Sequence, residues 1–461
     1  MAWSVRDAPQ RFNARCDAAH ARVGSAAVRR AVCALLLVVG VGGPGGLATT
    51  GCDGEREARP TPAAPASADA TGSAERGAPA PPAPAAPVAP RRALWVLAEG
   101  ARRVLDHPER IPELMRDARA LGATDLFVQV YRAGRAWYDS ERADATPWRR
   151  VHDASDIDPL ALLLERAGEA GLRVHAWVNV LSLARNREAP ILTQLGPGIV
   201  LSDREGRSLL DYPDFEVPEP ERRYYRMGTP GLYLDPAAPG VAEWLTETFA
   251  ELVARYPALD GLHLDYIRYP DVLPFAPGSR FGVGLDFGYG ADTRARFERE
   301  TGKRAPLGDS LANADAWDDW RRERVSTLVR DVAAAARARR PGLALSAAVW
   351  TYADRAYFVL GQDWRAWLEQ GSLDFAVPMA YTRDDRVLRY QAEHFAGRPD
   401  AGRIWVGLGT WLFASDPARA LAQIALVRRA GVRDVALFSY DSIATEPALF
   451  EALHAEVARG E

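Results

Sequence analysis

The sequence is poor in the residues that build most metal sites and thiol enzymes. It has 3 cysteines and 7 histidines in 461 residues. The cysteines are Cys16, Cys33 and Cys52, so the rest of the chain has no disulfide, thiol nucleophile or cysteine ligand. No HExxH pairing occurs, which argues against a zinc hydrolase. We therefore expect neither a metal site nor a cofactor.

The chain also lacks an excess of charge of either sign. Its 57 Lys and Arg residues stand against 61 Asp and Glu residues, which gives a formal net charge of −4. A balance this near neutral provides no electrostatic basis for nucleic-acid binding. We expect no nucleic-acid partner, and the sequence gives no indication of an oligomeric state.

The apolar run at residues 31–43 is too short to span a bilayer comfortably. Two arginines precede it, and small residues ending in Gly51 and Cys52 follow it, which is the pattern of an export signal. Cys52 after Gly51 resembles the cleavage and lipidation site of bacterial lipoproteins. We expect residues 1–52 to be this signal, with Cys52 lipidated. Plain secretion and an uncleaved anchor are the alternatives.

Residues 53–90 contain a long stretch dominated by alanine and proline. Such a composition cannot bury a core and favours extended conformations. We interpret it as a disordered tether between a lipid anchor and a folded domain, with a ligand for a proline-binding module as the alternative. The protein would then be a membrane-anchored lipoprotein of the bacterial cell envelope, or a secreted protein.

From Arg91 onward, short apolar segments rich in β-forming residues alternate with amphipathic helical segments. The predicted strands are Ala93–Ala98, Asp125–Tyr131, Arg173–Leu181, Gly261–Tyr269, Leu343–Trp350, Phe375–Tyr381, Ile404–Trp411 and Asp434–Tyr440. The predicted helices are Pro112–Leu121, Asp158–Ala170, Val241–Tyr256, Asp315–Arg339, Asp363–Glu369, Asp416–Ala430 and Glu446–Ala458. This alternation predicts an α/β fold, a (β/α)₈ TIM barrel over residues 91–461. A doubly wound open sheet is the alternative, but no nucleotide-binding glycine-rich turn follows the first strand.

Two connections are unusually long, Ser182–Pro239 after the third strand and Pro270–Gly290 after the fourth. Long loops in a compact domain are usually functional. Both begin at the carboxyl ends of strands, where barrel enzymes carry their active sites. We therefore expect these two loops to form the walls of a cleft.

Polar side chains share one face on three consecutive predicted strands. Residues two apart lie on the same face of a strand. The sets are Gln129 and Tyr131 on the second strand, His175, Trp177 and Asn179 on the third, and His263 and Asp265 on the fourth. Burying such groups without partners costs about 1–3 kcal/mol each. We interpret them as the floor of a polar pocket, with a satisfied internal hydrogen-bond network as the alternative.

Asp265 is the carboxylate best placed for catalysis. It lies near the carboxyl end of a barrel strand, where acid–base and nucleophilic groups are found. Arg268 is a possible partner that would keep Asp265 ionised, as a nucleophile or a general base requires. A purely structural ion pair with Arg268 is the alternative. Further catalytic candidates lie just past other strand ends, each with a loop or helix-cap role as the alternative; they are Glu99, Asp384, Asp385 and Asp441.

Aromatic residues also gather at the predicted strand ends, including Trp137, Tyr138, Trp177, Trp350, Tyr352, Tyr381, Trp411 and Tyr440. Aromatic rings stack on the apolar faces of sugars, whereas carboxylates and amides bind sugar hydroxyls. The pattern favours a carbohydrate substrate, although some of these rings will only pack under loops. The substrate-binding candidates are Gln129, Tyr131, His175, Trp177, Asn179, His263, Arg268, Trp350, Tyr381, Trp411 and Tyr440.

The chain from about Arg92 to Ser442 resembles the bacterial glycosyl-hydrolase-like family 10 proteins, which are distinct from the family 10 xylanases. The most specific matching segments are Val174-His175-Ala176-Trp177-Val178-Asn179 and Asp260-Gly261-Leu262-His263-Leu264-Asp265-Tyr266. Supporting segments include Arg92-Ala93-Leu94-Trp95-Val96, Phe127-Val128-Gln129-Val130, Trp137-Tyr138-Asp139-Ser140, Pro378-Met379-Ala380-Tyr381 and Ala436-Leu437-Phe438-Ser439-Tyr440. Together the matches cover almost the whole predicted barrel.

The resemblance implies a (β/α)₈ barrel that acts on glycosidic bonds, and some relatives are lipoproteins that cleave peptidoglycan glycan strands lacking stem peptides. The family's catalytic acid would correspond to Asp265. Two departures concern the second carboxylate: Tyr266 stands where many relatives have a second Asp, and Arg135 stands where many have an Asp in the second unit.

A glycoside hydrolase of the cell envelope is therefore the first hypothesis, and a carbohydrate-binding barrel without catalysis is the second. Catalysis requires a second carboxyl group about 5–10 Å from Asp265. A barrel enzyme for a phosphate ester is a third possibility, but it calls for a basic anion site at the later strand ends that the sequence does not show.

The predicted anchor is tested by replacing Cys52 with Ala. Because the lipid would hold the chain on the membrane, the variant should move from the membrane fraction to the soluble fraction. Immunoblotting of fractionated cells measures this. Unchanged membrane association would indicate an uncleaved apolar segment instead.

Overall fold

Eight parallel strands form the centre of the fold, in a computed structural model that describes residues 89–274, 286–308 and 310–460. The barrel strands are β1 (Arg92–Val96), β2 (Asp125–Arg132), β4 (Arg173–Asn179), β8 (Gly261–Asp265), β10 (Ala344–Trp350), β11 (Phe375–Met379), β12 (Val406–Gly409) and β13 (Val435–Phe438). Each lies within or close to a strand expected from the sequence. The predicted signal, Cys52 and most of the predicted tether lie outside the described residues.

The sheet closes on itself through β1. Around the barrel the strand order is β1, β13, β12, β11, β10, β8, β4 and β2, and β1 pairs in parallel with both β13 and β2. An open doubly wound sheet would leave two unpaired edges, whereas this sheet has none among the eight strands. The fold is therefore a (β/α)₈ barrel, as the strand–helix alternation predicts.

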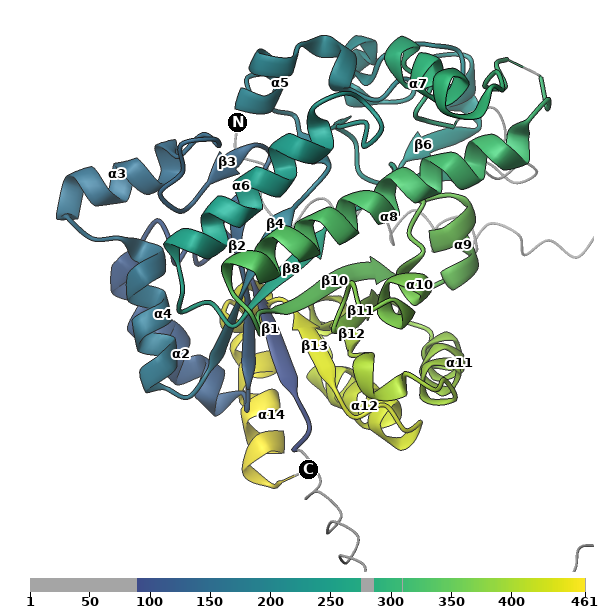
Figure 1. The fold of residues 1–461 in the computed structure, drawn as a ribbon. Helices are drawn as coiled ribbons and strands as arrows, with labels where there is room; N and C mark the ends of the chain where they lie inside the picture. Colours follow the sequence, from purple (N-terminus) through teal and green to yellow (C-terminus); the bar gives the residue numbers. More distant parts are fainter. Residues whose placement is uncertain (1–88, 275–285, 309, 461) are drawn as a thin grey trace, which may run out of the picture. The chain divides into compact units, whose positions relative to one another are not determined.

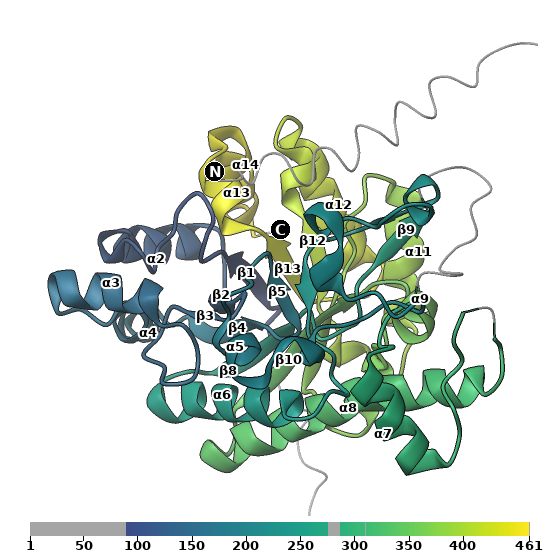
Figure 2. The same ribbon diagram turned by 90° about the horizontal axis from the view of Figure 1, so that it is seen from above.

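Helices surround the strands in both views (Figures 1 and 2). The longer ones are α2 (Ile111–Ala120), α3 (Thr146–Ser155), α4 (Pro159–Glu169), α6 (Val241–Arg255), α7 (Ala291–Thr301), α8 (Ala314–Arg339), α11 (Asp385–Ala396), α12 (Pro417–Arg429) and α14 (Pro447–Ala458). The shorter ones are α5 (Pro190–Leu195), α9 (Ala353–Phe358), α10 (Trp364–Glu369) and α13 (Tyr440–Ala444). None of the helices in the described part of the chain combines the length and apolarity needed to cross a membrane.

The helices begin and pack where the sequence provides caps and apolar stripes. Asp158 caps α4 by accepting a hydrogen bond from the Ala161 N–H at 2.9 Å, and proline follows it at the first helical position. On α6, Val241, Leu245 and Phe249 are spaced four apart and are fully buried. This stripe covers the outside of the barrel.

Several elements were not expected from the sequence. The structure adds α3, α7 and α11, of which α11 lies where the sequence pattern is weakest, between the sixth and seventh strands. The long loops contain small antiparallel pairs, β5 (Ser182–Ala184) with β7 (Leu232–Tyr233), and β6 (Tyr225–Met227) with β9 (Val272–Pro274). β3 (Arg135–Ala136) extends β2 as a hairpin. These elements satisfy backbone groups that the loops would otherwise leave unpaired.

Aromatic rings fill the inside of the barrel, where branched aliphatic side chains are usual. The cluster comprises Ala93, Trp95, Phe127, Trp177, Phe375, Val377, Trp405 and Ala436. Phe127 stacks on His263 at 4.1 Å between ring centroids, and Phe375 stacks on Trp405 at the same distance. The outer face of the sheet packs against the helices in a separate and larger apolar cluster.

A buried ion pair connects the first strand to the last helix. Arg92 on β1 donates to both carboxylate oxygens of Glu456 on α14, at 2.9 and 2.6 Å. Arg92 is 4% exposed and Glu456 is 5% exposed. Removing one member of such a pair leaves the other charge buried without a partner.

We expect Glu456→Ala to lower the free energy of unfolding by about 3–5 kcal/mol. Urea unfolding followed by circular dichroism measures the change. Glu451→Ala on the exposed face of the same helix is the matched control and should change stability by less than about 0.5 kcal/mol. Equal effects of the two substitutions would show that the ion pair contributes nothing specific.

Candidate functional site

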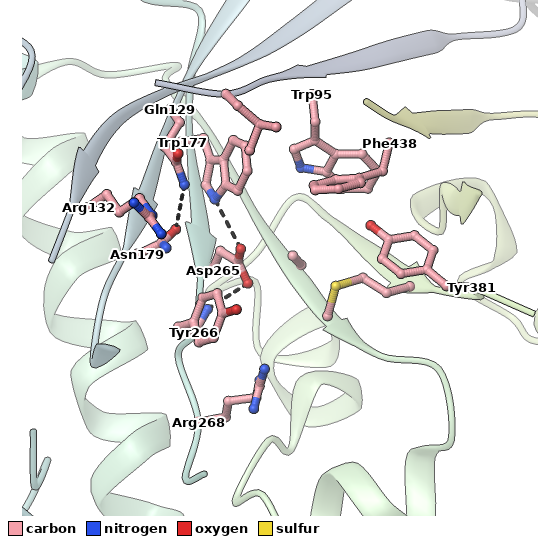
Figure 3. A pocket seen from close by; sticks show the side chains of 13 residues that line it. Trp95, Gln129, Arg132, Trp177, Asn179, Asp265, Tyr266, Arg268, Tyr381 and Phe438 are labelled. Carbon is pink, nitrogen blue, oxygen red and sulfur yellow. Dashed lines mark hydrogen bonds between the residues drawn. The ribbon is translucent and has the colours of Figure 1, made fainter. Parts of the chain in front are cut away.

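A cavity of about 230 Å³ opens at the carboxyl ends of the barrel strands. It is lined by Trp95, Leu97, Gln129, Arg132, Trp177, Asn179, Asp265, Tyr266, Arg268, Ala348, Met379, Tyr381 and Phe438 (Figure 3). Six of these are candidates from the sequence, namely Gln129, Trp177, Asn179, Asp265, Arg268 and Tyr381. The cavity combines aromatic walls with a carboxylate, two amides and two guanidinium groups.

Asp265 is the last residue of β8 and is 6% exposed. One carboxylate oxygen accepts a hydrogen bond from the Trp177 indole N–H at 3.1 Å, and the other accepts from the Tyr266 backbone N–H at 2.7 Å. Tyr266 has a φ of 50°, a left-handed conformation that is uncommon for an aromatic residue. This turn ends the strand just after the carboxylate, at the edge of the cavity.

Burial raises the pKa of Asp265 above its ordinary value. The charge of Arg268 and the hydrogen bonds from Tyr266 and Trp177 act in the opposite direction but do not outweigh the loss of hydration. Arg268 thus favours the ionised form, as the sequence predicts, but burial has the larger effect and the net shift of the pKa is upward. A carboxyl group with a raised pKa is suited to donate a proton.

Two amide side chains extend this polar wall along the neighbouring strands. Gln129 on β2 donates to the Asn179 side-chain carbonyl at 3.2 Å and accepts from the Ala98 backbone N–H at 3.3 Å. Asn179 on β4 lies directly opposite Asp265 in the parallel register. The two amides are thus held in fixed orientations beside the carboxylate.

The expected common face of Gln129 and Tyr131 is interrupted by a bulge. In the register of β2 with β4, Gln129 lies opposite Trp177, but Tyr131 lies opposite Val178, the very next residue. The extra residue turns Tyr131 outward, where its ring meets Phe249 of α6 at 5.3 Å. It also turns Arg132 inward, where it lines the cavity.

His175 and His263 lie inside the barrel and are not among the residues that line the cavity. His175 lies 3.0 Å from the Asp125 carboxylate, through its Nε2. The Nε2 of His263 lies 3.2 Å from the Trp95 indole N–H, and its Nδ1 lies 2.8 Å from the Ser346 hydroxyl. An indole can only donate, so Nε2 accepts and Nδ1 carries the proton.

Burial, together with nearby His175, lowers the pKa of His263 well below its ordinary value, so this ring is neutral near pH 7. The hydrogen-bond network that includes Trp95 supports the floor of the cavity without exposing either imidazole to it.

Besides Tyr131, three aromatic candidates are placed outside the cavity. Trp350 and Trp411 are half-buried and pack against the outer core. Tyr440 is fully buried, and its hydroxyl donates to Asp117 of α2 at 2.8 Å. Tyr440 follows the end of β13, where the chain enters α13, and strand alternation no longer predicts its direction there.

The other candidate carboxylates have structural contacts. Asp384 caps α11 and pairs with Arg386 at 2.9 Å. Asp385 accepts from Arg419 and Gln423 at 3.2 and 3.1 Å. Neither lines the cavity.

Asp441 and Glu99 contact the region around the first strand end. Asp441 is 1% exposed and accepts from the backbone N–H groups of Leu97 and Arg102 at 3.0 and 2.8 Å, so it fixes the loop after β1. Glu99 pairs with Arg132, which lines the cavity, and with Arg135 at 3.0 Å. Of the four further carboxylates, Glu99 and Asp441 contact residues of the cavity wall, Glu99 through the Arg132 guanidinium and Asp441 through the Leu97 backbone N–H. Asp265 is the sole carboxylate among the described residues that line the cavity.

Several cavity residues were not singled out from the sequence. Trp95 lies on the first strand, and Leu97 follows its end. Because the two residues are two positions apart, strand alternation could have predicted that they share a face. Phe438 ends β13, and its ring lies 5.8 Å from Trp95 and 5.6 Å from Tyr381. These residues are apolar, and a search for polar groups passes over them.

Neither long loop lines the central cavity with a described residue. Tyr266 and Arg268, which do line it, follow β8 directly and precede the loop Pro270–Gly290, and none of the described residues 182–239, 270–274 and 286–290 lines it. The loop after β4 instead meets the start of α7 around a second cavity of about 310 Å³, lined by residues that include Ser202, Asp211 and Asp292. The described residues of the two loops therefore do not form the walls of the central site that the sequence predicted.

Among the residues that the structure describes, no group of three or more His, Cys, Asp or Glu side chains is arranged to hold a metal ion.

The family that matches this sequence is described as glycosyl hydrolase-like 10, over residues 90–396. The match spans most of the barrel and includes Asp265 and both amides of the cavity wall. The chain belongs to this family. Family membership and the barrel fold together support a glycoside hydrolase-type function.

Two curated relatives carry glycosyl hydrolase names. The glycosyl hydrolase DigH of Escherichia coli K12 is 27% identical over 332 residues, which cover 66% of this chain and 64% of the relative. The glycosyl hydrolase YngK of Bacillus subtilis is 24% identical over 295 residues, which cover 60% of this chain and 50% of the relative. The chain thus spans less than two thirds of the length of these relatives.

Among solved structures, the glycoside hydrolase domain of PgaB (BpsB) from Bordetella bronchiseptica is similar in fold. Its TM-score is 0.56 at 16% sequence identity, and the alignment covers 79% of this chain and 98% of that domain. The likeness confirms the barrel architecture.

Proposed function

We propose that this protein hydrolyses glycosidic bonds in a cell-envelope or extracellular glycan, with peptidoglycan glycan strands as the foremost candidate substrate and Asp265 as the catalytic carboxyl group. The observation that carries the proposal is the position of Asp265 at the carboxyl end of β8, in a cavity of aromatic and amide side chains, and the upward shift of its pKa agrees with it. Glycoside hydrolysis requires a protonated carboxyl group beside the leaving oxygen. Export and a lipid anchor at Cys52 complete the proposal, because they would place the barrel where such glycans occur.

In this mechanism the proton of Asp265 passes to the glycosidic oxygen as its bond to the anomeric carbon breaks. Water then adds to the anomeric carbon and loses a proton to a base. The amides of Gln129 and Asn179 are positioned to bind sugar hydroxyls, and the rings of Trp95, Trp177 and Tyr381 provide apolar surfaces for sugar faces. Glu99 is our candidate for the second carboxyl group, because it binds Arg132 in the cavity wall.

A carbohydrate-binding barrel without catalysis is the second candidate function. The presence of one carboxylate among the described cavity residues favours it, since most glycoside hydrolases use two. The two candidates differ in turnover, whereas both include sugar binding. Wild-type binding of glycan strands without product formation would establish the second.

Asp265→Asn removes the acid while keeping the shape of the side chain. We expect turnover to fall by a factor of about 10³ or more, because the leaving oxygen loses its proton donor, and sugar affinity to change little. Mass spectrometry of products from glycan strands free of stem peptides measures turnover, and calorimetry measures binding.

Asp153→Asn, on the exposed surface of α3, is the matched control for the Asp265 variant and should keep full turnover. A folded Asp265→Asn protein with near-normal turnover would refute the catalytic role.

The role of Asp265 can be read from a second substitution, Trp177→Phe. The Trp177 N–H stabilises the charged carboxylate, so its loss should raise the pKa of Asp265 further. A general acid must be protonated, and the alkaline limb of the kcat/KM profile should therefore move to higher pH.

A nucleophile or general base must be ionised, and in that case the acidic limb would move instead. Trp244→Phe, on the outer helix α6, should leave both limbs in place. If the Trp177 variant moves neither limb, Asp265 is not the group that titrates in the profile.

A further inference from the structure

Arg268 is a buried cation without an acidic partner. It is 6% exposed, its Nε has no hydrogen-bond partner, and its one hydrogen bond runs from Nη1 to the Tyr269 carbonyl at 3.5 Å, near the outer limit for such a bond. Its guanidinium lies 4.8 Å from the centre of the Tyr266 ring. No carboxylate in the described part of the chain forms an ion pair with it.

Other arginines of equal burial in this barrel are paired. Arg92, at 4% exposure, binds both oxygens of Glu456, and Arg321, at 6% exposure, binds Asp286 through two nitrogens at 3.0 and 2.9 Å. Arg268 has no such ion pair, and the carboxylates of Asp271 and Asp265 stabilise its charge only at longer range. Arg268 differs from these two in one further respect, which is that it lines the central cavity (Figure 3).

The second cation of the cavity already has an acidic partner. Arg132 pairs with Glu99, a carboxylate that also binds Arg135. Asp271 and Asp265 influence Arg268 electrostatically, but Asp271 pairs with Arg355 and Asp265 accepts its hydrogen bonds from Trp177 and Tyr266. The donors of Arg268 therefore remain available to a group that enters the cavity.

We propose that Arg268 binds a carboxylate substituent of the substrate, so that the site selects a glycan whose sugars carry a carboxylate; this rests on the proposed function of the cavity as a glycan site. A guanidinium fork matches the two oxygens of a carboxylate. Two sources have this chemistry, the lactyl ether of N-acetylmuramic acid in strands free of stem peptides, and the uronic acids.

Arg268 acts here as a specificity determinant. A purely electrostatic role toward Asp265 would instead affect charged and neutral glycans alike.

The test measures dissociation constants with the full chain, in an Asp265→Asn background that prevents cleavage. The probes are a peptidoglycan tetrasaccharide with free lactyl carboxylates, the same tetrasaccharide with those carboxylates amidated, tetra-galacturonate, and its methyl ester. We expect at least one carboxylated probe to bind about tenfold or more tightly than its neutral counterpart. The pair that shows the difference identifies the source of the carboxylate.

Arg268→Gln in the same background should reduce that ratio to about one while leaving the affinity for the neutral probe within about threefold. Arg268→Lys keeps the charge and should retain part of the preference. Arg386→Gln, an exposed arginine that pairs with Asp384, is the matched control and should keep the full ratio.

A ratio of one with Arg268 present, for both pairs of probes, would overturn the proposal without any need for a folded variant. An unchanged ratio in Arg268→Gln would overturn it as well. Cleavage by the wild-type chain is measured separately on the free tetrasaccharide. If the wild-type chain forms no products but the carboxylated probe still binds more tightly than its neutral counterpart, the hydrolase function is refuted and the role of Arg268 stands. If the chain cleaves the tetrasaccharide but binds carboxylated and neutral probes equally, the role of Arg268 is refuted and the hydrolase function stands.

Discussion

β1 is hydrogen-bonded to strands from both ends of the barrel sequence, β2 and β13, and the site depends on this double pairing. It closes the sheet, and all eight strands then run in the same direction around one axis. Their carboxyl ends consequently meet at one rim. Trp95 and Phe438, far apart in the sequence, become neighbours at 5.8 Å, and both reach the cavity that also contains Asp265. A sheet left open between β1 and β2 would separate Leu97 from Gln129.

The inside of the barrel supports this rim through polar contacts that aliphatic side chains could not make. Ser346 binds His263, which in turn accepts from the indole of Trp95 in the cavity floor. The stacking of Phe127 on His263 fixes the plane of that imidazole. Because the ring is neutral and both its nitrogens are occupied, it orients Trp95 without bringing a charge beneath the site. The sequence left an internal hydrogen-bond network and a polar pocket as alternatives. The barrel contains both, the network inside the barrel and the pocket at the carboxyl ends of its strands.

The sequence predicted the barrel well because the alternation of apolar strands and amphipathic helices does not depend on local irregularities. The direction of a single side chain does depend on them. Each of the eight strands has a run of apolar residues that identifies it. Direction follows from alternation only while the strand is regular, and the bulge in β2 reverses it for Tyr131 and Arg132. Past the strand ends the rule has no basis, and Asp441, an apparent site carboxylate, instead binds backbone N–H groups of the loop after β1. Asp265 was found because it lies within a regular strand.

The electrostatics of the cavity link catalysis to substrate recognition. Burial raises the pKa of Asp265, and the charge of Arg268 opposes that shift. A substrate carboxylate bound to Arg268 would cancel the opposing charge and add a negative one near Asp265, and both changes favour the protonated acid. It would also give the buried guanidinium an ion-pair partner within hydrogen-bonding distance. The substrate carboxylate would then both bind Arg268 and favour the protonated form of Asp265. A neutral glycan would occupy the aromatic walls without either effect, and discrimination between the two glycans should appear in the chemical step as well as in affinity.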